Sequence, residues 1–143
     1  MQEHHFSQYV AGIYRRSKND LNRQLGKLDV RATQSDLLMF IYEHPGRQQN
    51  QISQEMSVDP SLLARDLTTL SRKGWVTRTP LRTDRRAKVI TLTPTGEQLA
   101  QRLTGIMDRW WQQLFAENPT IDKVLLDQQL DSVYQVLLER DRS

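Results

Sequence analysis

Cysteine is absent from this chain of 143 residues. Without cysteine the chain has no disulfide bond, no thiolate nucleophile and no zinc site built on thiolate ligands. The histidines, His4, His5 and His44, do not have the spacing of a metal-binding set. We therefore expect neither a metal site nor a cofactor.

Long apolar segments are also missing. The longest apolar run covers residues 37–42, whereas a helix that spans a bilayer needs about 20 apolar residues. The beginning of the chain is polar and lacks the apolar stretch of a signal peptide. We expect a cytoplasmic protein with no membrane partner.

The usual signals of catalysis are missing as well. The sequence has no Ser/His/Asp spacing, no glycine-rich phosphate loop and no pair of carboxylates beside a histidine. We therefore expect a protein that is not an enzyme.

Positive charge is spread unevenly along the chain. The net charge is only +3, but residues 58–93 contain eight basic and three acidic side chains. The rest of the chain contains twelve basic and fourteen acidic ones. A local basic segment favours an anionic partner, although surface charges also cluster by chance.

The spacing of apolar residues predicts a mainly α-helical chain with one small β-hairpin. The expected helices cover residues 6–28, 33–43, 49–57, 60–73, 95–116 and 120–138, and the two expected strands cover residues 75–81 and 87–93. Because a two-stranded hairpin is marginally stable alone, we expect it to pack against the neighbouring helices.

Capping residues indicate where several helices begin. Thr33 is an expected N-cap, with Asp36 at the capping-box position. Asp59 is a good N-cap, and Pro60 is a good first helical residue. Thr120 is expected to cap the last helix.

The helix expected at residues 60–73 has two unlike faces. Leu63, Leu67 and Leu70 form an apolar stripe. The opposite face is polar and basic, as a helix in the DNA major groove requires, although an ordinary surface helix also has a polar face. The residues of this helix that we expect to contact DNA are Pro60, Ser61, Ala64, Arg65, Thr68, Thr69 and Arg72.

The two strands that follow are joined by a charged stretch. The order of helix, turn, helix and hairpin is that of a winged helix-turn-helix, in which the hairpin tip reaches an adjacent minor groove. We expect Asp84 to accept a hydrogen bond from a neighbouring arginine side chain and to hold it extended; a flexible, solvated turn is the alternative. The expected DNA contacts of the wing are Arg82, Asp84, Arg85, Arg86 and Lys88.

Residues 58–99 resemble the MarR family of bacterial transcription regulators, and its SlyA-like members in particular. The residues that carry the resemblance are Leu70, Lys73, Gly74, Val76, Arg78, Asp84, Arg86, Leu92, Thr93 and Gly96. The resemblance implies that Asp84 and Arg86 matter for DNA binding. It also implies a homodimer.

The resemblance divides the chain into a DNA-binding lobe, residues 33–93, and a helical dimerisation region, residues 1–30 and 95–143. The outer helices contain large apolar residues that need a cover, which the second copy in a homodimer would provide; packing within one chain is the alternative. These residues are Trp110, Trp111, Leu114, Phe115, Leu137 and Leu138.

Members of the family often bind small aromatic acids or other amphipathic effectors between the dimer helices and the DNA-binding lobe. The residues that we expect to line such a pocket are Tyr9, Ile13, Arg16, Tyr42 and Trp110. The alternative, which each residue taken alone favours, is an ordinary place in the core or on the surface.

The sequence thus predicts a double-stranded DNA-binding transcription regulator, a ligand-responsive repressor that acts as a homodimer on a pseudo-palindromic operator. The alternative is a winged-helix module that binds protein and has no DNA specificity. Salt distinguishes the two, because binding to phosphates weakens steeply as salt rises.

Overall fold

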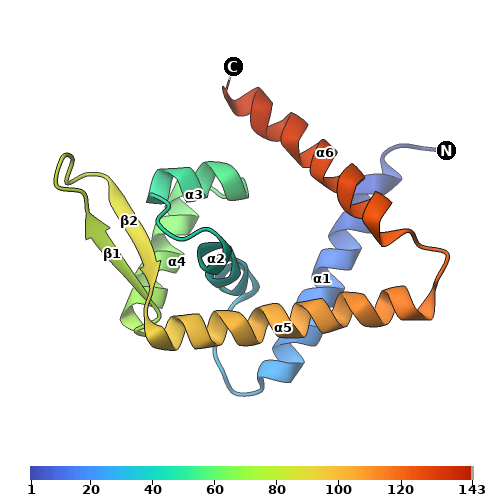
Figure 1. Ribbon diagram of the computed structural model, residues 1–143, viewed down its shortest axis with the longest axis horizontal. Coiled ribbons are helices and arrows are strands. Elements are labelled where there is room, and N and C mark those ends of the chain that lie inside the picture. The colour runs from blue at the N-terminus through green and yellow to red at the C-terminus, as the bar shows by residue number, and fades with distance from the viewer. Residues whose placement is uncertain (143) are drawn as a thin grey trace.

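The computed structural model describes residues 1–142 and has the expected order of elements (Figure 1). The helices and strands are α1 (His5–Leu25), α2 (Ala32–Glu43), α3 (Gln49–Met56), α4 (Pro60–Arg72), β1 (Val76–Pro80), β2 (Lys88–Leu92), α5 (Pro94–Glu117) and α6 (Lys123–Arg142). The predicted fold class, mainly helical with a small hairpin, is confirmed.

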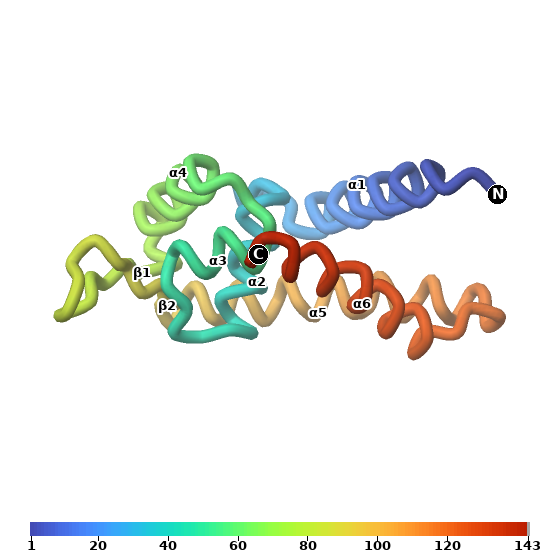
Figure 2. The backbone as a smooth tube through the Cα atoms, turned by 90° about the horizontal axis from the view of Figure 1, so that it is seen from above, coloured from blue at the N-terminus to red at the C-terminus, as the bar shows by residue number. Residues whose placement is uncertain are grey.

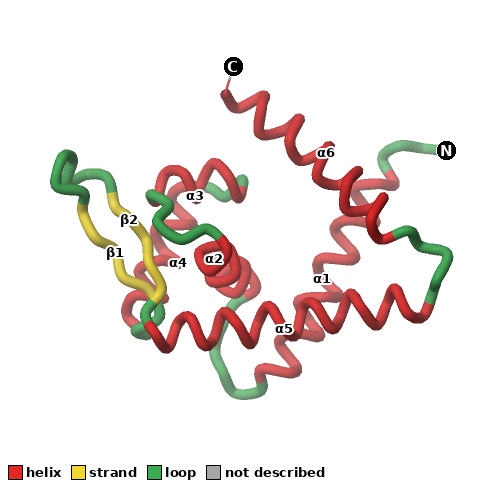
Figure 3. The backbone as a smooth tube through the Cα atoms, in the orientation of Figure 1, coloured by secondary structure: helices red, strands yellow, loops and turns green. Residues whose placement is uncertain are grey.

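The elements form two regions joined by the long helix α5. Helices α2, α3 and α4 and the hairpin gather around the first half of α5, and α1 and α6 lie toward its second half (Figures 1 and 2). Coloured by secondary structure, the two strands stand at one end of the molecule and the N-terminus at the other, while the C-terminal end of α6 lies near α3 (Figure 3). None of the helices within residues 1–142 is long and apolar enough to cross a membrane.

The hydrophobic core lies between α2, α3, α4, the hairpin and the first half of α5, and Leu21 and Leu25 of α1 also belong to it. Leu38, Ile52, Leu67, Leu70 and Ile90 are all fully buried there. Helix α6, in contrast, has no buried residue within the described part of the chain. One copy of the chain therefore completes the core of only one of its two regions.

The hairpin is antiparallel and is held to the helices along one side. Val76 pairs with Leu92 at one end of the ladder, and Pro80 pairs with Lys88 at the other. The Ile90 backbone N–H donates to the Arg47 carbonyl at 3.0 Å, which fixes β2 to the segment before α3. This attachment, together with the buried Ile90 side chain, stabilises a hairpin that would be marginal alone.

The start of α4 is the one that its capping residues predict. The Asp59 carboxylate accepts hydrogen bonds from the backbone N–H groups of Ser61 and Leu62, at 3.0 and 3.1 Å. Pro60 follows as the first helical residue, where its missing N–H costs nothing. The cap fixes the end of the helix that we expect to approach DNA.

The predicted cap of α2 is wrong. The helix begins at Ala32, and the Arg31 backbone N–H donates to Gln34 Oε1 at 3.2 Å. Thr33 is therefore already inside the helix. Asp36 does not take part in the cap, and its carboxylate instead contacts Lys18 on α1.

The predicted cap of α6 is wrong as well. The Asp122 carboxylate accepts a hydrogen bond from the Leu125 backbone N–H at 3.1 Å, and the helix begins at Lys123. Thr120 instead hydrogen-bonds to the Asn118 side chain in the preceding turn. A carboxylate one residue before the helix reaches its free N–H groups, whereas a hydroxyl three residues before it does not.

Candidate nucleic-acid interface

Helix α4 has the two faces that its sequence predicts. Leu63, Leu67 and Leu70 are at most 1 % exposed and anchor the helix in the core. On the opposite side Ser61, Arg65, Thr68 and Arg72 are exposed, and so is Pro60 at the start of the helix. Ala64 and Thr69 are half-buried at the edges of this face.

The acidic residue of α4 is turned away from the exposed face. Asp66 is 6 % exposed, and its carboxylate accepts a hydrogen bond from Gln34 Nε2 at 3.3 Å. Arg65 and Arg72 make no ion pair within residues 1–142. The exposed face of α4 therefore has positive charge that no carboxylate of the described chain neutralises.

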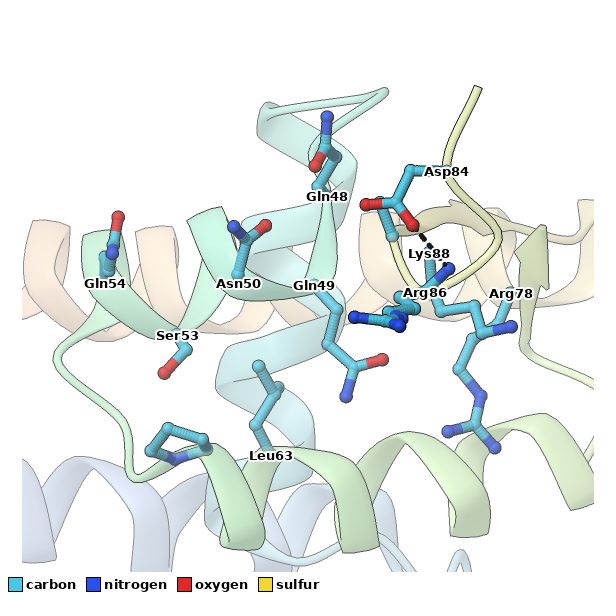
Figure 4. A pocket seen from close by; sticks show the side chains of 12 residues that line it. Gln48, Gln49, Asn50, Ser53, Gln54, Leu63, Arg78, Asp84, Arg86 and Lys88 are labelled. Carbon is cyan, nitrogen blue, oxygen red and sulfur yellow. Dashed lines mark hydrogen bonds between the residues drawn. The ribbon is translucent and has the colours of Figure 1, made fainter. Parts of the chain in front are cut away.

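The tip of the hairpin is also basic, but the predicted role of Asp84 is wrong. Its carboxylate accepts a hydrogen bond from the backbone N–H of Arg86 at 3.0 Å, and not from an arginine side chain (Figure 4). The Ala87 backbone N–H donates to the Asp84 carbonyl at 3.1 Å. Aspartate commonly bonds to the backbone two residues ahead in turns, so Asp84 orders the backbone of the tip.

The basic side chains of the tip extend into solvent. Arg82, Arg85 and Arg86 are exposed and have no ion-pair partner among the described residues. Lys88 is half-buried, and its ammonium group donates to the Arg85 carbonyl at 3.1 Å. Lys88 therefore supports the tip, while the three arginines are available to a partner.

A groove of about 690 Å³ lies between the start of α3, the start of α4 and the hairpin. Its walls include the amide side chains of Gln48, Gln49 and Asn50 opposite Arg86 and Arg78 (Figure 4). Sequence reasoning missed these amides as site residues, although the run of amide residues at the start of α3 was a visible signal. The groove thus lies between the start of α4 and the hairpin.

The residues predicted to bind an effector do not all lie together. Tyr9, Ile13, Arg16 and Trp110 line one groove of about 630 Å³ between α1 and α5. Tyr42 is elsewhere, packed against the core, where its hydroxyl accepts a hydrogen bond from Gln101 Nε2 at 3.2 Å.

The groove between α1 and α5 is mainly apolar, with a few polar groups. Trp110 is fixed by a hydrogen bond from its indole N–H to the Asp20 carboxylate at 2.8 Å. Arg16 supplies a guanidinium group to the same groove. In residues 1–142 no three histidine or acidic side chains are grouped so that they could hold a metal ion.

These elements together define a winged helix-turn-helix protein: α3 and α4 with the turn between them, followed by a hairpin with a basic tip. Comparison with known proteins then identifies the family of the chain. The sequence model of the MarR family matches residues 28–87.

Individual relatives extend the match over most of the chain. The multiple antibiotic resistance protein MarR of Salmonella typhimurium is 32% identical over 104 residues, which are 73% of this chain and 72% of that protein. A MarR transcriptional regulator from Methanosarcina mazei has the same fold, with a TM-score of 0.84 and 21% identity over 95% of this chain and 98% of its own. A mutant MarR from E. coli, solved in complex with operator DNA, is 27% identical with a TM-score of 0.72, and covers 89% of this chain and 91% of its own.

The chain belongs to the MarR family. The proteins of this family are dimeric transcription regulators. The resemblance noted in the sequence is thereby confirmed at the level of the family.

Proposed function

We propose that the chain is a sequence-specific regulator of transcription that binds double-stranded DNA as a homodimer. The observation that carries the proposal is the unneutralised basic surface formed by the outer face of α4 and the hairpin tip. Helix α4 enters the major groove, where Arg65 reaches the edge of a guanine. The tip lies along the adjacent minor groove, where Arg82, Arg85 and Arg86 meet its negative potential.

The homodimer is supported by the apolar surface of the outer helices. Phe6, Tyr9 and Val10 on α1 are more than half exposed, as are Val124 and Val133 on α6. Large apolar side chains exposed on two outer helices favour a protein interface that covers them. A second copy, related by two-fold symmetry, would place two α4 helices about 34 Å apart, one helical turn of DNA.

The groove between α1 and α5 supports a proposal that an effector regulates the protein. Its aromatic walls suit a small aromatic or amphipathic effector, and Arg16, Asp20 and Glu117 supply charged groups that could orient it. Such a ligand alters DNA binding only if its affinity differs between two arrangements of the dimer. Bound across a promoter, the dimer would exclude RNA polymerase, and we therefore propose a repressor.

The experiment that tests the proposal is fluorescence anisotropy on duplex DNA from upstream of the gene for this chain, compared with a shuffled duplex over a salt series. We expect tight binding, a clear preference for the native duplex, and a steep loss of affinity as salt rises. Absence of binding to either duplex at low salt would overturn the proposal. Binding that is equal on both duplexes would favour a protein-binding or non-specific role.

Two variants separate the roles of helix and wing. Arg65→Ala should cost about 1–3 kcal/mol on the operator and relax its specificity, because a base contact is lost. Arg86→Ala should weaken binding without changing the dimer or its thermal unfolding. Arg109→Ala, which removes an exposed arginine from α5, is the matched control and should have little effect. Early unfolding of the Arg86 variant would make that residue structural.

A further inference from the structure

The hydroxyl groups of both threonines at the outer face of α4 are turned back onto the helix. Thr68 Oγ1 donates to the Ala64 carbonyl at 2.9 Å, and Thr69 Oγ1 donates to the Arg65 carbonyl at 3.2 Å. A hydroxyl has a single hydrogen to donate. In this arrangement neither threonine can donate a hydrogen bond to a base or to a phosphate.

Thr68 is further constrained by the hairpin. Arg78, which extends from β1 toward α4 (Figure 4), donates from Nη2 to Thr68 Oγ1 at 3.2 Å. This bond occupies one of the two acceptor positions of the hydroxyl and places a guanidinium group beside it. The polar capacity of the Thr68 side chain is therefore mostly used within the protein.

The group that remains for a partner is the γ-methyl of Thr68. The residue is exposed and lies three positions after Arg65 on the same face of the helix. Thr69 is half-buried and lies at the edge of that face, so it is less suited to the same role. The methyl of this exposed residue and the Arg65 guanidinium on the same face offer a partner two unlike contacts, one apolar and one charged.

We infer that Thr68 reads a thymine through its methyl group. This inference rests on the proposed function, since it names what α4 recognises once it lies in the major groove. The C5-methyl of thymine is the apolar group on the major-groove edges of the bases, and threonine methyls contact it. Residues three apart on a helix have Cβ atoms about 5–6 Å apart, so the thymine lies within about two base pairs of the guanine bound by Arg65, at about 3.4 Å per pair.

A purely structural role for Thr68 predicts a different result. If the residue serves only to bind Arg78 and position the wing, its hydroxyl is the important group and its methyl is not. Thr68→Val keeps both branches at Cβ and replaces the hydroxyl by a methyl, whereas Thr68→Ser keeps the hydroxyl and removes the methyl. The two variants therefore separate the two roles.

The experiment replaces each thymine of the operator in turn by uracil, which lacks only the methyl group, and measures binding of three proteins by fluorescence anisotropy. For the unchanged protein we expect one thymine per half-site whose replacement weakens binding about four-fold, the equivalent of one buried methyl of about 0.8 kcal/mol. Thr68→Val should keep this sensitivity to uracil. Thr68→Ser should bind the thymine and uracil duplexes equally.

The controls make the result unambiguous. Thermal unfolding of both variants must match that of the unchanged protein, and a uracil outside the half-sites should have no effect. If the unchanged protein binds its operator specifically but no thymine responds to replacement, the inference about Thr68 is overturned and the proposed function stands. If the Ser variant keeps the sensitivity, the methyl is read by another residue. If no duplex is bound specifically, the proposed function itself has failed.

Discussion

The DNA-binding lobe and the outer helices differ in how far one chain completes them. In the lobe, α4 buries three leucines to 1 % exposure or less and turns its basic residues outward. In the outer region, α6 is amphipathic but leaves Val133 62% exposed and buries none of its described residues. Within one chain the lobe already has a buried core and an exposed basic face, whereas the apolar side chains of the outer helices need a second copy to cover them. The dimer formed by the outer helices thus sets the distance between the two DNA-binding lobes.

The two regions share apolar packing, since Leu21 and Leu25 of α1 belong to the same hydrophobic core as the lobe, and specific polar contacts also join them. The Asp36 carboxylate on α2 binds Lys18 and Tyr14 of α1. The Tyr134 hydroxyl on α6 donates to the Glu55 carbonyl at the end of α3. The third joint is the close approach of α5 to the start of the hairpin. A change in the outer helices can therefore reach the lobe through the shared core and through these polar contacts.

The largest effect is expected from a substitution in the outer helices that disrupts the dimer. Val133→Asp places a charge in the apolar surface that we assign to the dimer, and an interface residue of this kind contributes about 2 kcal/mol or more. The dimer dissociation constant should rise about 30-fold or more, as measured by sedimentation velocity. The lobe should keep its helical circular dichroism.

The matched control is Gln129→Asp on the same helix, which adds the same charge at an exposed polar position. It should leave the dimer intact. A Val133→Asp variant that stays as dimeric as the Gln129→Asp variant would show that α6 does not form the interface.

The joint between the hairpin and α5 should tolerate no side chain. A Cβ added at Gly96 would lie 1.9 Å from the Trp75 carbonyl oxygen, a backbone atom that cannot move aside easily. Gly96→Ala should lower the free energy of unfolding by about 1–3 kcal/mol or more, because the two elements must separate. Urea denaturation measures this loss.

Gly105→Ala, further along α5, is the control for the Gly96 variant. The nearest atom to an added Cβ there is the end of the flexible Arg109 side chain at 3.2 Å. Because alanine favours a helix by about 1 kcal/mol over glycine, this variant should be as stable as the unchanged protein or more stable. Equal losses at both positions would mean that the close approach at Gly96 is not the cause.

The parts of this fold that the sequence predicted are those determined by neighbours along the chain. The faces of α4, the cap at Asp59 and the two strands follow from residue spacing and from local hydrogen bonds. The partner of Asp84 depended on the turn that the hairpin tip adopts, and the sequence alone did not define that turn.

Tertiary placement accounts for the other differences. Tyr42 was expected beside Tyr9, but α2 turns it toward Gln101 on α5. The amides of α3 lie beside the wing because β2 pairs with the segment before α3, a contact between residues about forty positions apart such as Gln48 and Val89. Pairings of this kind leave no periodic signal in the sequence.

The smallest expected effect concerns the joint between α1 and α2, and it depends on pH. Partial burial, and then the hydrogen bond from its hydroxyl to Asp36 at 2.6 Å, raise the pKa of Tyr14 above its usual value near 10, although 42% of the residue remains exposed. Because the folded state favours the protonated phenol, Tyr14 stabilises the protein fully below the pKa of the unfolded chain and progressively less as pH rises above about 10.

Tyr14→Phe should therefore be less stable than the unchanged protein at pH 8, and the difference between them should shrink toward pH 11. Urea denaturation of both proteins at several pH values measures it, and Tyr9→Phe, at an exposed tyrosine of the same helix, is the control with no such trend. If the stabilities of the Tyr14→Phe variant and the unchanged protein differ by the same amount up to high pH, the hydrogen bond from Tyr14 to Asp36 does not stabilise the contact between α1 and α2.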